Sequence, residues 1–422
     1  MHDKIDGLET RDAAQAVRPR IAVVSTTIPP GASGQARVLG HLLGFPPAEN
    51  CLLLADQSPF PGGAVPDAMA ANYAILKSRR AYLTGDGWLP RRMPRLNALA
   101  GMLGSIFHRA REIDRHVRSF GASALVVCTA SPFDLPAGTL VALRRRLRLV
   151  TYLFDDPVYQ WPSGPLRTFA RLWEPIWSRV AAAVIVPNEA LAEEYRRRRA
   201  RAPIVVRNPV PPQAFSPPNA GWPPSPGPYT IAYTGSVYHA QADAFLNLLA
   251  ALRQVEGWSL HIYTSQNEAD LGALGISGPN VVRHDHVDQS ESYLVQRSAD
   301  ILFLPLAFHS TIQETLRTSA PMKMGEYLAS GRPILVHAPS DTFVAQHLAQ
   351  AEAAIVVTHC DSGALAAALR DVPSNSPLRQ RVCANAARLA QDYGVARARE
   401  VFWQAIGPVA DERRRGGGPS SG

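Results

Sequence analysis

Short runs of apolar residues recur along the whole chain, and segments with helical spacing separate them. Strands that are buried on both faces have this continuous apolar character, and helices between such strands make the sheet parallel. The pattern therefore predicts an α/β protein built on parallel sheets. The predicted strands are residues 20–26, 51–55, 124–128, 149–154, 183–187 and 203–207 in the first half, and 229–233, 259–263, 280–283, 301–305, 333–336 and 354–357 in the second.

A proline-rich segment divides the two sets of strands. Nine of the twenty residues from 209 to 228 are proline, so this segment forms neither a helix nor a central strand. A chain of 422 residues also exceeds the size of one ordinary core. We therefore expect two Rossmann-like domains that face each other across a cleft. The predicted boundaries are 1–19 for a flexible amino terminus, 20–208 for the first domain, 209–228 for the linker, 229–390 for the second domain, 391–410 for a carboxy-terminal helix that returns to the first domain, and 411–422 for a flexible tail.

The positive charge of the chain is concentrated in its first half. Residues 1–210 hold 28 Lys and Arg against 17 Asp and Glu, a net charge of +11, whereas residues 211–422 hold 15 against 18, a net charge of −3. A basic domain attracts nucleic acid, a membrane surface or an anionic substrate. Because the sequence has no RNA-binding aromatic signature, helix-turn-helix pattern or zinc-finger spacing, we expect no nucleic-acid partner. An anionic or lipid-linked partner at a membrane surface fits the charge.

One basic helical segment bears on membrane binding. Residues 91–118 combine several arginines with apolar side chains at helical spacing, among them Leu103, Ile106 and Phe107. Such a helix either lies on an anionic bilayer or packs its apolar stripe on the sheet, with the arginines in solvent. The sequence has no stretch of 18 apolar residues and no hydrophobic leader, and its four cysteines lack metal-ligand spacing. We expect a cytoplasmic protein with buried free thiols, associated at most peripherally with the inner membrane.

A helix start in the second half is the strongest candidate for chemistry. Only three of the 43 basic residues are lysine, and one of them, Lys323, follows Pro321 closely. Pro321 is predicted to be the first residue of a helix that ends at Gly331. A cation in the first turn opposes the helix dipole unless an anion binds there, so Lys323 and the free helix N–H groups indicate a phosphate site. Glu326 lies on the same face and can take the hydroxyls of a ribose, unless the two side chains form an ordinary surface ion pair.

The second half resembles the nucleotide-sugar-dependent glycosyltransferases of the two-Rossmann-domain (GT-B) type, in particular family 4, also called group 1. The resemblance rests on residues 321–333, which read Pro-x-Lys-x-x-Glu-Tyr-Leu-Ala-x-Gly-x-Pro, and on shorter matches at 184–188, 206–210, 233–236 and 298–305. It implies a hexosyltransferase that moves a sugar from a nucleoside diphosphate sugar to an acceptor hydroxyl, in polysaccharide or glycolipid assembly. Retention of the anomeric configuration is the default of that family, and no metal or other cofactor is implied.

The resemblance also implies roles for residues of the predicted helix. Glu326 would hold the ribose of the donor, and Lys323 would hold the diphosphate together with the N–H groups that begin at Met322. Members of the family often carry another glutamate eight positions earlier, which contacts the transferred sugar. This chain has Thr318 at that position, so the carboxylate contact is either absent or supplied by Glu314.

Two glycine-containing turns complete the implied donor site. Gly235 and Ser236 would let the backbone approach the phosphates, because glycine has no Cβ to obstruct them. Val287 would lie near the base through backbone contacts. The loop from Gly31 to Gly34 would border both the acceptor and the donor phosphates.

Two adjacent carboxylates are the remaining candidates for catalysis. Asp155 and Asp156 follow a predicted strand, at the end where α/β proteins collect functional side chains. The resemblance leads us to expect a histidine one position earlier, where this chain has Phe154. One carboxylate could act as general base on the acceptor hydroxyl, or orient that hydroxyl. The alternative is that one of them caps the turn before Pro157.

Other functions share parts of this pattern. A sugar-nucleotide epimerase of the same fold would use internal carboxylates and need no acceptor, and a non-catalytic protein would bind nucleotide sugars without turnover. The charge asymmetry and the lack of an obvious extra acid pair favour transfer over epimerisation. A dinucleotide oxidoreductase fits poorly, because no GxGxxG follows the first predicted strand.

Overall fold

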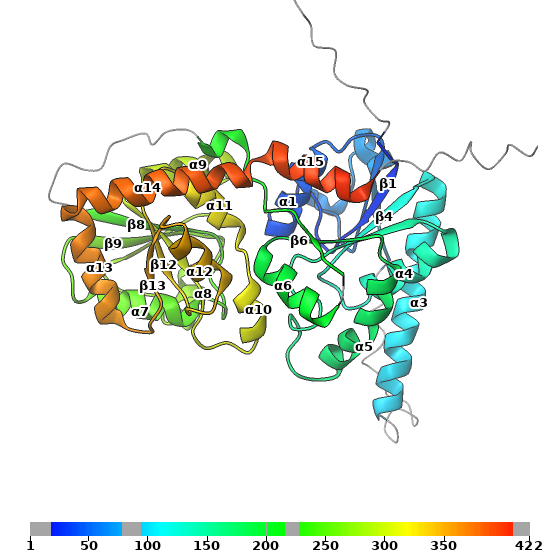
Figure 1. The fold of residues 1–422 in the computed structure, drawn as a ribbon, viewed down its shortest axis with the longest axis horizontal. Coiled ribbons are helices and arrows are strands. Elements are labelled where there is room, and N and C mark those ends of the chain that lie inside the picture. Colours follow the sequence, from blue (N-terminus) through cyan, green and yellow to red (C-terminus); the bar gives the residue numbers. More distant parts are fainter. Residues whose placement is uncertain (1–17, 78–93, 200, 216–227, 408–422) are drawn as a thin grey trace, which may run out of the picture.

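Two parallel β-sheets, one in each half of the chain, form the framework of the protein (Figure 1). The computed structural model describes residues 18–77, 94–199, 201–215 and 228–407. The first sheet has the strand order β3-β2-β1-β4-β5-β6-β7 and the second has the order β10-β9-β8-β11-β12-β13. In each sheet, the chain adds two strands on one side of the first strand and then the remaining strands on its other side, as in doubly wound nucleotide-binding folds. The predicted α/β class with two Rossmann-like domains is confirmed.

The strands agree closely with the apolar runs of the sequence. Those of the first domain are β1 Ile21–Val24, β2 Cys51–Ala55, β3 Tyr73–Ile75, β4 Ala124–Cys128, β5 Arg148–Tyr152, β6 Ala183–Val186 and β7 Ile204–Val205. Those of the second are β8 Tyr229–Thr234, β9 Trp258–Tyr263, β10 Val281–His284, β11 Ile301–Pro305, β12 Ile334–His337 and β13 Ile355–Val357. The sequence pattern misses β3, because three residues at a sheet edge carry too short a pattern to stand out.

Helices cover both faces of each sheet. The first domain has α1 Gly34–Leu43, α3 Pro94–Phe120, α4 Asp134–Arg145, α5 Pro165–Val180 and α6 Glu189–Arg198, with the short 3-10 helices η1 Pro61–Gly63 and η2 Asp67–Asn72. The second domain has α7 Ala242–Leu252, α8 Glu268–Ala273, α9 Gln289–Ser298, α10 Gln313–Thr318, α11 Met322–Ala329, α12 Phe343–Gln350, α13 Ser362–Ser374 and α14 Ser376–Ala390. Alternate residues of a strand point to opposite faces. Accordingly, Ala22 and Val24 of β1 pack with α3, α4 and α5, whereas Ile21 and Val23 pack with α1 and with α15, the helix Val395–Ile406.

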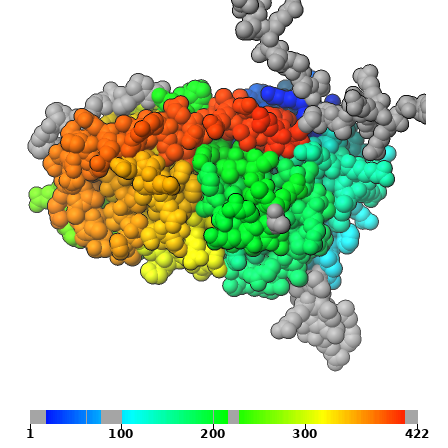
Figure 2. Space-filling model, in the orientation of Figure 1, coloured from blue at the N-terminus to red at the C-terminus, as the bar shows by residue number. Residues whose placement is uncertain are grey.

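The chain crosses between the domains twice, and the two crossings lie side by side. After α14, the short helix η4 (Gln391–Tyr393) leads to α15 (Val395–Ile406), which packs on α1, β5 and β6 of the first domain. In the other crossing, the Val210 N–H donates to the Tyr393 carbonyl at 2.7 Å, and the Val395 N–H donates to the Val210 carbonyl at 3.1 Å. Figure 2 shows α14 and α15 as one band along both domains.

Some predicted features lie outside the described residues. These are residues 1–17, residues 78–93 at the start of the basic helical segment, residues 216–227 of the linker and residues 408–422. The part of the linker that is described contains the 3-10 helix η3, Pro212–Phe215. Within the described ranges, no helix is long and apolar enough to cross a membrane. All four cysteines are free thiols. Cys51 and Cys128 are buried as predicted, whereas Cys383 is half-buried and Cys360 is exposed, so the prediction of buried thiols is wrong for Cys360 and only partly right for Cys383.

Candidate functional site

A cavity of about 540 Å³ lies between the two domains, next to the carboxyl ends of β1, β8 and β11. Doubly wound sheets bind their ligands at this edge, where the strand order reverses. The volume is in the range of small-molecule sites, roughly 300–1,000 Å³. The residues predicted to bind the donor line it together, namely Gly235, Ser236, Val287, Pro321, Met322, Lys323 and Glu326. Gly34 lines it from the first domain, whereas Gly31 does not line it.

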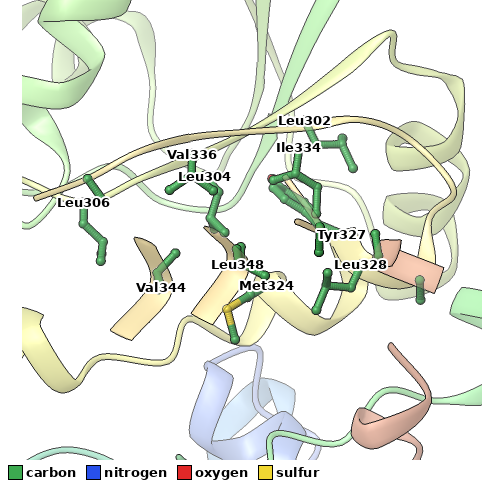
Figure 3. Close-up of a cluster of buried hydrophobic side chains, with 14 of the residues drawn as sticks. Leu302, Leu304, Leu306, Met324, Tyr327, Leu328, Ile334, Val336, Val344 and Leu348 are labelled. Atoms are coloured by element: carbon green, nitrogen blue, oxygen red, sulfur yellow. The ribbon is translucent and has the colours of Figure 1, made fainter. Parts of the chain in front are cut away.

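Packing of one helix face fixes the position of α11 at this cavity. Met324, Tyr327 and Leu328 have the three- and four-residue spacing of a single helix face, and they pack beneath β11 and β12 and against α12 (Figure 3). The Tyr327 hydroxyl also accepts the Thr234 N–H at 3.2 Å, which ties α11 to the end of β8. The start of α11 therefore lies beside the glycine turn that follows β8.

The helix begins one residue later than the sequence predicts. Pro321 has φ −56° and ψ 133°, so it precedes the helix and Met322 is the first helical residue. The extended ψ of Pro321 keeps the preceding segment out of the helix. The predicted end is correct, since Gly331 has a φ of 74°, in the left-handed region where glycine is favoured.

Lys323 projects from α11 toward the turn at Gly235. Its Nζ lies 3.7 Å from the centre of the Tyr233 ring, and a Cβ at Gly235 would lie 3.3 Å from that Nζ. Gly235 has a φ of 121°, so both its conformation and its closeness to the lysine require glycine. Burial lowers the pKa of Lys323 from 10.5 to about 7; the nearby Glu326 opposes this shift, and Arg37 adds to it. An anion at this position would stabilise the charged form of the lysine.

Glu326 is buried with one of its carboxylate oxygens unused. Its side chain is 3% exposed, and its Oε2 accepts a hydrogen bond from Gln296 Nε2 at 3.1 Å. Its Oε1 has no hydrogen-bond partner among the described residues, and Arg37 Nη1 is 4.0 Å away. Burial raises the pKa of Glu326, while Arg37 opposes that shift. A buried carboxylate oxygen that lacks a donor is suited to a ligand hydroxyl.

The amino end of α1 faces the amino end of α11. Ser33 caps α1 by accepting the Ala36 N–H at 3.2 Å, and a Cβ on Gly34 would lie 3.8 Å from the Cβ of Met322. Two helix N-termini therefore meet at the cavity, and each offers free N–H groups and a positive dipole end. Such an arrangement is suited to phosphate groups.

Arg37 is a site residue that the sequence analysis missed. It lies near the start of α1, lines the cavity from the first domain and is the closest cation to Glu326 among the described ion pairs. The signal that singled out Lys323, a cation near a helix start, also applies to Arg37, which follows a glycine loop. Arginine is the common basic residue of this chain, so Arg37 does not stand out from the sequence as the rare lysine does.

The far end of the cavity is formed by the ends of β9 and β10. Tyr263, Ser265 and His286 line it beside Val287. The neighbouring Asp288 is a helix cap, because its carboxylate accepts the Glu291 N–H at 2.8 Å at the start of α9. The position of Val287 fits the predicted base end of a nucleotide, and that role stays a prediction.

The two adjacent carboxylates after β5 differ sharply. Asp156 is buried, accepts the N–H groups of Val158 and Tyr159 at 2.9 Å each, and forms an ion pair with Arg198 at 2.7 Å. These contacts favour the capping alternative for Asp156. The Asp155 carboxylate, in contrast, makes no hydrogen bond or ion pair among the described residues. Burial and the charge of Asp156 raise the pKa of Asp155 to about 6.

Asp155 is not among the residues that line the cavity. Its charge contributes to the raised pKa of Tyr238, which lines the cavity from the second domain. The Thr129 hydroxyl accepts the N–H of Phe154 at 2.9 Å and so holds the backbone just before Asp155. Of the two carboxylates, Asp155 is the one that is available to a ligand.

Glu314 lies outside the cavity lining and pairs with the first domain. Its Oε1 accepts a hydrogen bond from Arg167 Nη1 at 3.0 Å, and this contact contributes to the lowered pKa of Glu314. Thr318 is buried, and its carbonyl accepts the Asn188 side chain at 2.8 Å. Neither residue brings a carboxylate to the cavity, so a catalytic role for Glu314 stays a prediction without geometric support.

Comparison with known proteins agrees with this architecture. Residues 228–375 match the family model described as "Glycosyl transferases group 1". A search of curated proteins found no significant match. The chain is similar in fold to a sucrose-phosphate synthase from Thermosynechococcus elongatus, with a TM-score of 0.65 and 13% identity over 92% of this chain and 98% of the other.

Two further solved structures have the same fold. One is an Anabaena protein in complex with UDP and glucose, with a TM-score of 0.59 and 14% identity over 92% of this chain and 99% of the other. The second is described as a UDP-N-acetylglucosamine 2-epimerase from Listeria monocytogenes, with a TM-score of 0.55 and 12% identity over 92% of this chain and 96% of the other.

The fold, the cavity and the family match together define the class of the protein as a glycosyltransferase with the GT-B fold. More narrowly, residues 228–375 of its second domain match the model of the group 1 glycosyltransferases. The predicted resemblance is thereby confirmed.

Proposed function

We propose that the protein transfers a hexosyl group from a nucleoside diphosphate sugar to an acceptor hydroxyl. The observation that carries this proposal is that Lys323 and Glu326 of α11 line the cavity together and that Glu326 has an unsatisfied oxygen there. Burial lowers the pKa of Lys323 to about 7, and Glu326 Oε1 accepts no hydrogen bond among the described residues. A diphosphate would pair with the lysine and the two helix N-termini, and a ribose would donate its hydroxyls to the glutamate.

The same groups suit the chemistry of the leaving group. As the glycosidic bond breaks, negative charge develops on the diphosphate. Lys323 and the N–H groups at the start of α11 would stabilise this charge more in the transition state than in the bound donor. The cleft between the domains would limit access of water, and therefore hydrolysis of the donor. Retention of the anomeric configuration rests on the family resemblance alone.

We place the acceptor against the first domain, with Asp155 as the residue that orients or deprotonates its hydroxyl. A carboxylate with a raised pKa is an effective general base near neutral pH. The net charge of +11 on residues 1–210 supports an acceptor that is anionic or lipid-linked. The proposal uses no metal, and the described residues contain no group of three or more His, Cys, Asp or Glu that could hold one.

The test is a panel of UDP-, GDP- and dTDP-sugars, read by thermal shift and by slow donor hydrolysis. We expect one donor class to raise the melting temperature and to be hydrolysed slowly. Lys323→Ala should weaken binding of the diphosphate strongly and binding of the free nucleoside little. Lys77→Ala, which removes an exposed lysine of the first domain, is the control and should change neither.

Two outcomes would contradict the proposal. If no nucleotide sugar raises the melting temperature, the donor site is wrong. If Lys323→Ala weakens the diphosphate and the nucleoside equally, the lysine is merely structural. An epimerase is the alternative function, and the similar Listeria structure is described as one. An epimerase would form an epimeric nucleotide sugar without release of the nucleoside diphosphate. A non-catalytic protein would show the thermal shift without hydrolysis.

A further inference from the structure

Helices α3, α4 and α5 pack on one face of the first sheet, and their outer side is unusually apolar. The described residues include eleven exposed large apolar side chains, and six of these are on the three helices. We call these six residues the α3–α5 surface: Leu103, Phe107, Leu143, Leu166, Leu172 and Ile176. Soluble proteins rarely expose large apolar patches, and such a patch often marks a site that binds a protein or a membrane.

The exposed charges of the same helices are all positive. The exposed arginines on α3 to α5, together with the residue that caps the end of α4, are Arg111, Arg115, Arg118, Arg144, Arg146, Arg171 and Arg179. The carboxylates are withdrawn from solvent: Glu112, Asp134 and Glu174 are buried, and the half-buried Asp114 pairs with Arg145 at 2.6 Å. The surface therefore combines cations with apolar side chains, and among the described residues of these helices it exposes no acid.

Helix α5 shows most clearly that these exposed apolar side chains do not contribute to the hydrophobic core. Its inner side buries Arg167 and Glu174, whereas its outer side exposes Leu172 at 67% and Ile176 at 44%. The buried charges are used in contacts within the protein, since Glu174 pairs with Arg198 at 3.1 Å and Arg167 with Glu314 at 3.0 Å. A helix that needed only to pack would place its leucine and isoleucine inward.

The start of α5 lies near the second domain, whereas α3 lies on the side of the first domain away from it (Figure 1). Parallel strands are joined by helices that run back against them, so each helix begins at the sheet edge that carries the cavity. The contact of Arg167 with Glu314 of the second domain places the start of α5 at the junction of the domains. In Figure 1, the amino-terminal part of α3 extends beyond the rest of the first domain on the same side as α5. On this helix Ile106 is buried, whereas Phe107 is 60% exposed.

We propose that the α3–α5 surface docks the protein on an anionic phospholipid bilayer, with the apolar side chains in the headgroup region and the arginines against lipid phosphates. Charge complementarity selects this occupant, because acidic lipids attract clustered arginines and the interface accepts leucine, isoleucine and phenylalanine. Docking would bring the protein to a membrane-borne acceptor, and this role of the surface rests on the proposed function. Docking itself requires no donor and no turnover.

The test is sedimentation of the full chain with vesicles of phosphatidylcholine, with or without phosphatidylglycerol. We expect binding to the anionic vesicles that weakens with salt. Arg171→Gln together with Arg179→Gln should weaken it by about 25-fold, from about fivefold for each arginine near a charged surface. Leu172→Glu together with Ile176→Glu should weaken it by about tenfold or more, through loss of inserted apolar area and added repulsion. Leu294→Glu is the matched control on the second domain, where Leu294 is 47% exposed, and it should bind as the unaltered chain does.

Separate measurements distinguish an error in the docking proposal from misfolding of a variant and from an error in the proposed function. Each variant should keep its melting temperature and its shift with the nucleotide sugar, because none of the substituted residues lines the cavity. Equal binding of the Leu172/Ile176 variant and the unaltered chain would overturn the proposal, and so would equal binding to neutral and anionic vesicles. If the chain is a dimer in light scattering and the Leu172/Ile176 variant is a monomer, the surface joins two copies, which also overturns it. Docking without a donor-induced thermal shift would instead refute the proposed function alone.

Discussion

Lys323 sits where its charge is unfavourable in the free protein. It lies in the first turn of α11, where the helix dipole is positive, and burial lowers its pKa to about 7. Gly235 and the Tyr233 ring enclose the ammonium group but supply no negative charge. Such strain at a functional group is stabilised by the rest of the fold and is relieved when the ligand binds.

This placement predicts that donor affinity depends on pH. A bound diphosphate favours the charged lysine, so above pH 7 binding must take up a proton, and affinity should fall by up to about tenfold per pH unit. A nucleotide sugar is the right probe, because its diphosphate does not titrate in this range. Calorimetry in two buffers of different ionisation enthalpy would count the protons. Lys323→Met should abolish the uptake, and an unchanged pH dependence in that variant would assign it to another group.

The same variant should stabilise the free protein. A lysine whose folded pKa is lowered destabilises the fold at every pH below its unfolded pKa of about 10.5, and most strongly below 7. The substituted methionine would be neutral and of similar shape, so Lys323→Met should raise the melting temperature in the absence of donor. The rise should diminish as the pH increases from 7 toward 10.

Asp155 and Asp156 make a matched pair for testing catalysis. Asp155→Asn should lower kcat by about 10²-fold or more with little change in donor affinity, because a general base acts on the acceptor. In the unaltered chain kcat should rise with pH through about 6, where the carboxylate loses its proton. Asp156→Ala should instead reduce stability by about 1–3 kcal/mol, through the lost partners of two N–H groups and Arg198. An Asp155→Asn variant with normal kcat would refute the role.

At the scale of elements, α11 depends on close approach to the crossing segments. A Cβ on Gly325 would lie 2.6 Å from Val210 Cγ2 and 3.2 Å from a Tyr393 ring carbon. The donor helix and the two crossings therefore share one contact, in which only glycine fits. This contact links the position of Lys323 to the junction of the domains.

Gly325→Ala should therefore displace α11 and weaken both folding and donor binding. Overpacking of this kind destabilises a protein by about 1–3 kcal/mol. The control is Gly272→Ala in α8, where no atom lies within 4 Å of the added Cβ, and where alanine favours the helix by up to about 1 kcal/mol. Thermal melting with and without nucleotide sugar measures both effects. Similar results for the two variants would show that the Val210 side chain can move away from the added Cβ without loss of stability.

At the scale of the whole molecule, two asparagines join the domains beside the donor helix. Asn188 donates to the Thr318 carbonyl and Asn208 donates to the Ala320 carbonyl, both at 2.8 Å. Asn188 also caps α6 by accepting the Leu191 N–H at 2.9 Å. The first domain thus holds the segment that leads into α11, which gives a physical reason for the family-like segments that contain these asparagines.

The pair of Arg167 and Glu314 tests whether Glu314 is catalytic. An ion pair in which Glu314 is 41% exposed is worth about 0–1 kcal/mol, so Glu314→Gln and Arg167→Gln should each lower kcat/KM by less than about fivefold. The double variant should lose no more than either single one. A contact of Glu314 with the transferred sugar would appear as a loss of about 10²-fold in Glu314→Gln alone. That result would restore its predicted catalytic role.

Much of the fold could be predicted because its signals are local. Apolar runs mark the strands, and Pro321 and Gly331 mark the two ends of α11. The short edge strand β3 and the exposure of Cys360 escaped prediction, since neither has a pattern of its own. The single-residue shift at the start of α11 reflects the two positions that proline can take at a helix start.

The sequence by itself determined the two Rossmann-like domains and predicted a phosphate site at the start of α11, because periodicity, proline and a cation at a helix start act over a few residues. Only the tertiary structure decided which side chains meet. It placed Arg37 of the first domain beside Glu326 of the second, and it paired Glu314 with Arg167, which lies 147 residues away. It also bound Asp156 to Arg198 and left Asp155 available. Contacts between distant residues follow from how the sheets and helices pack, and the spacing of residues along a chain does not encode them.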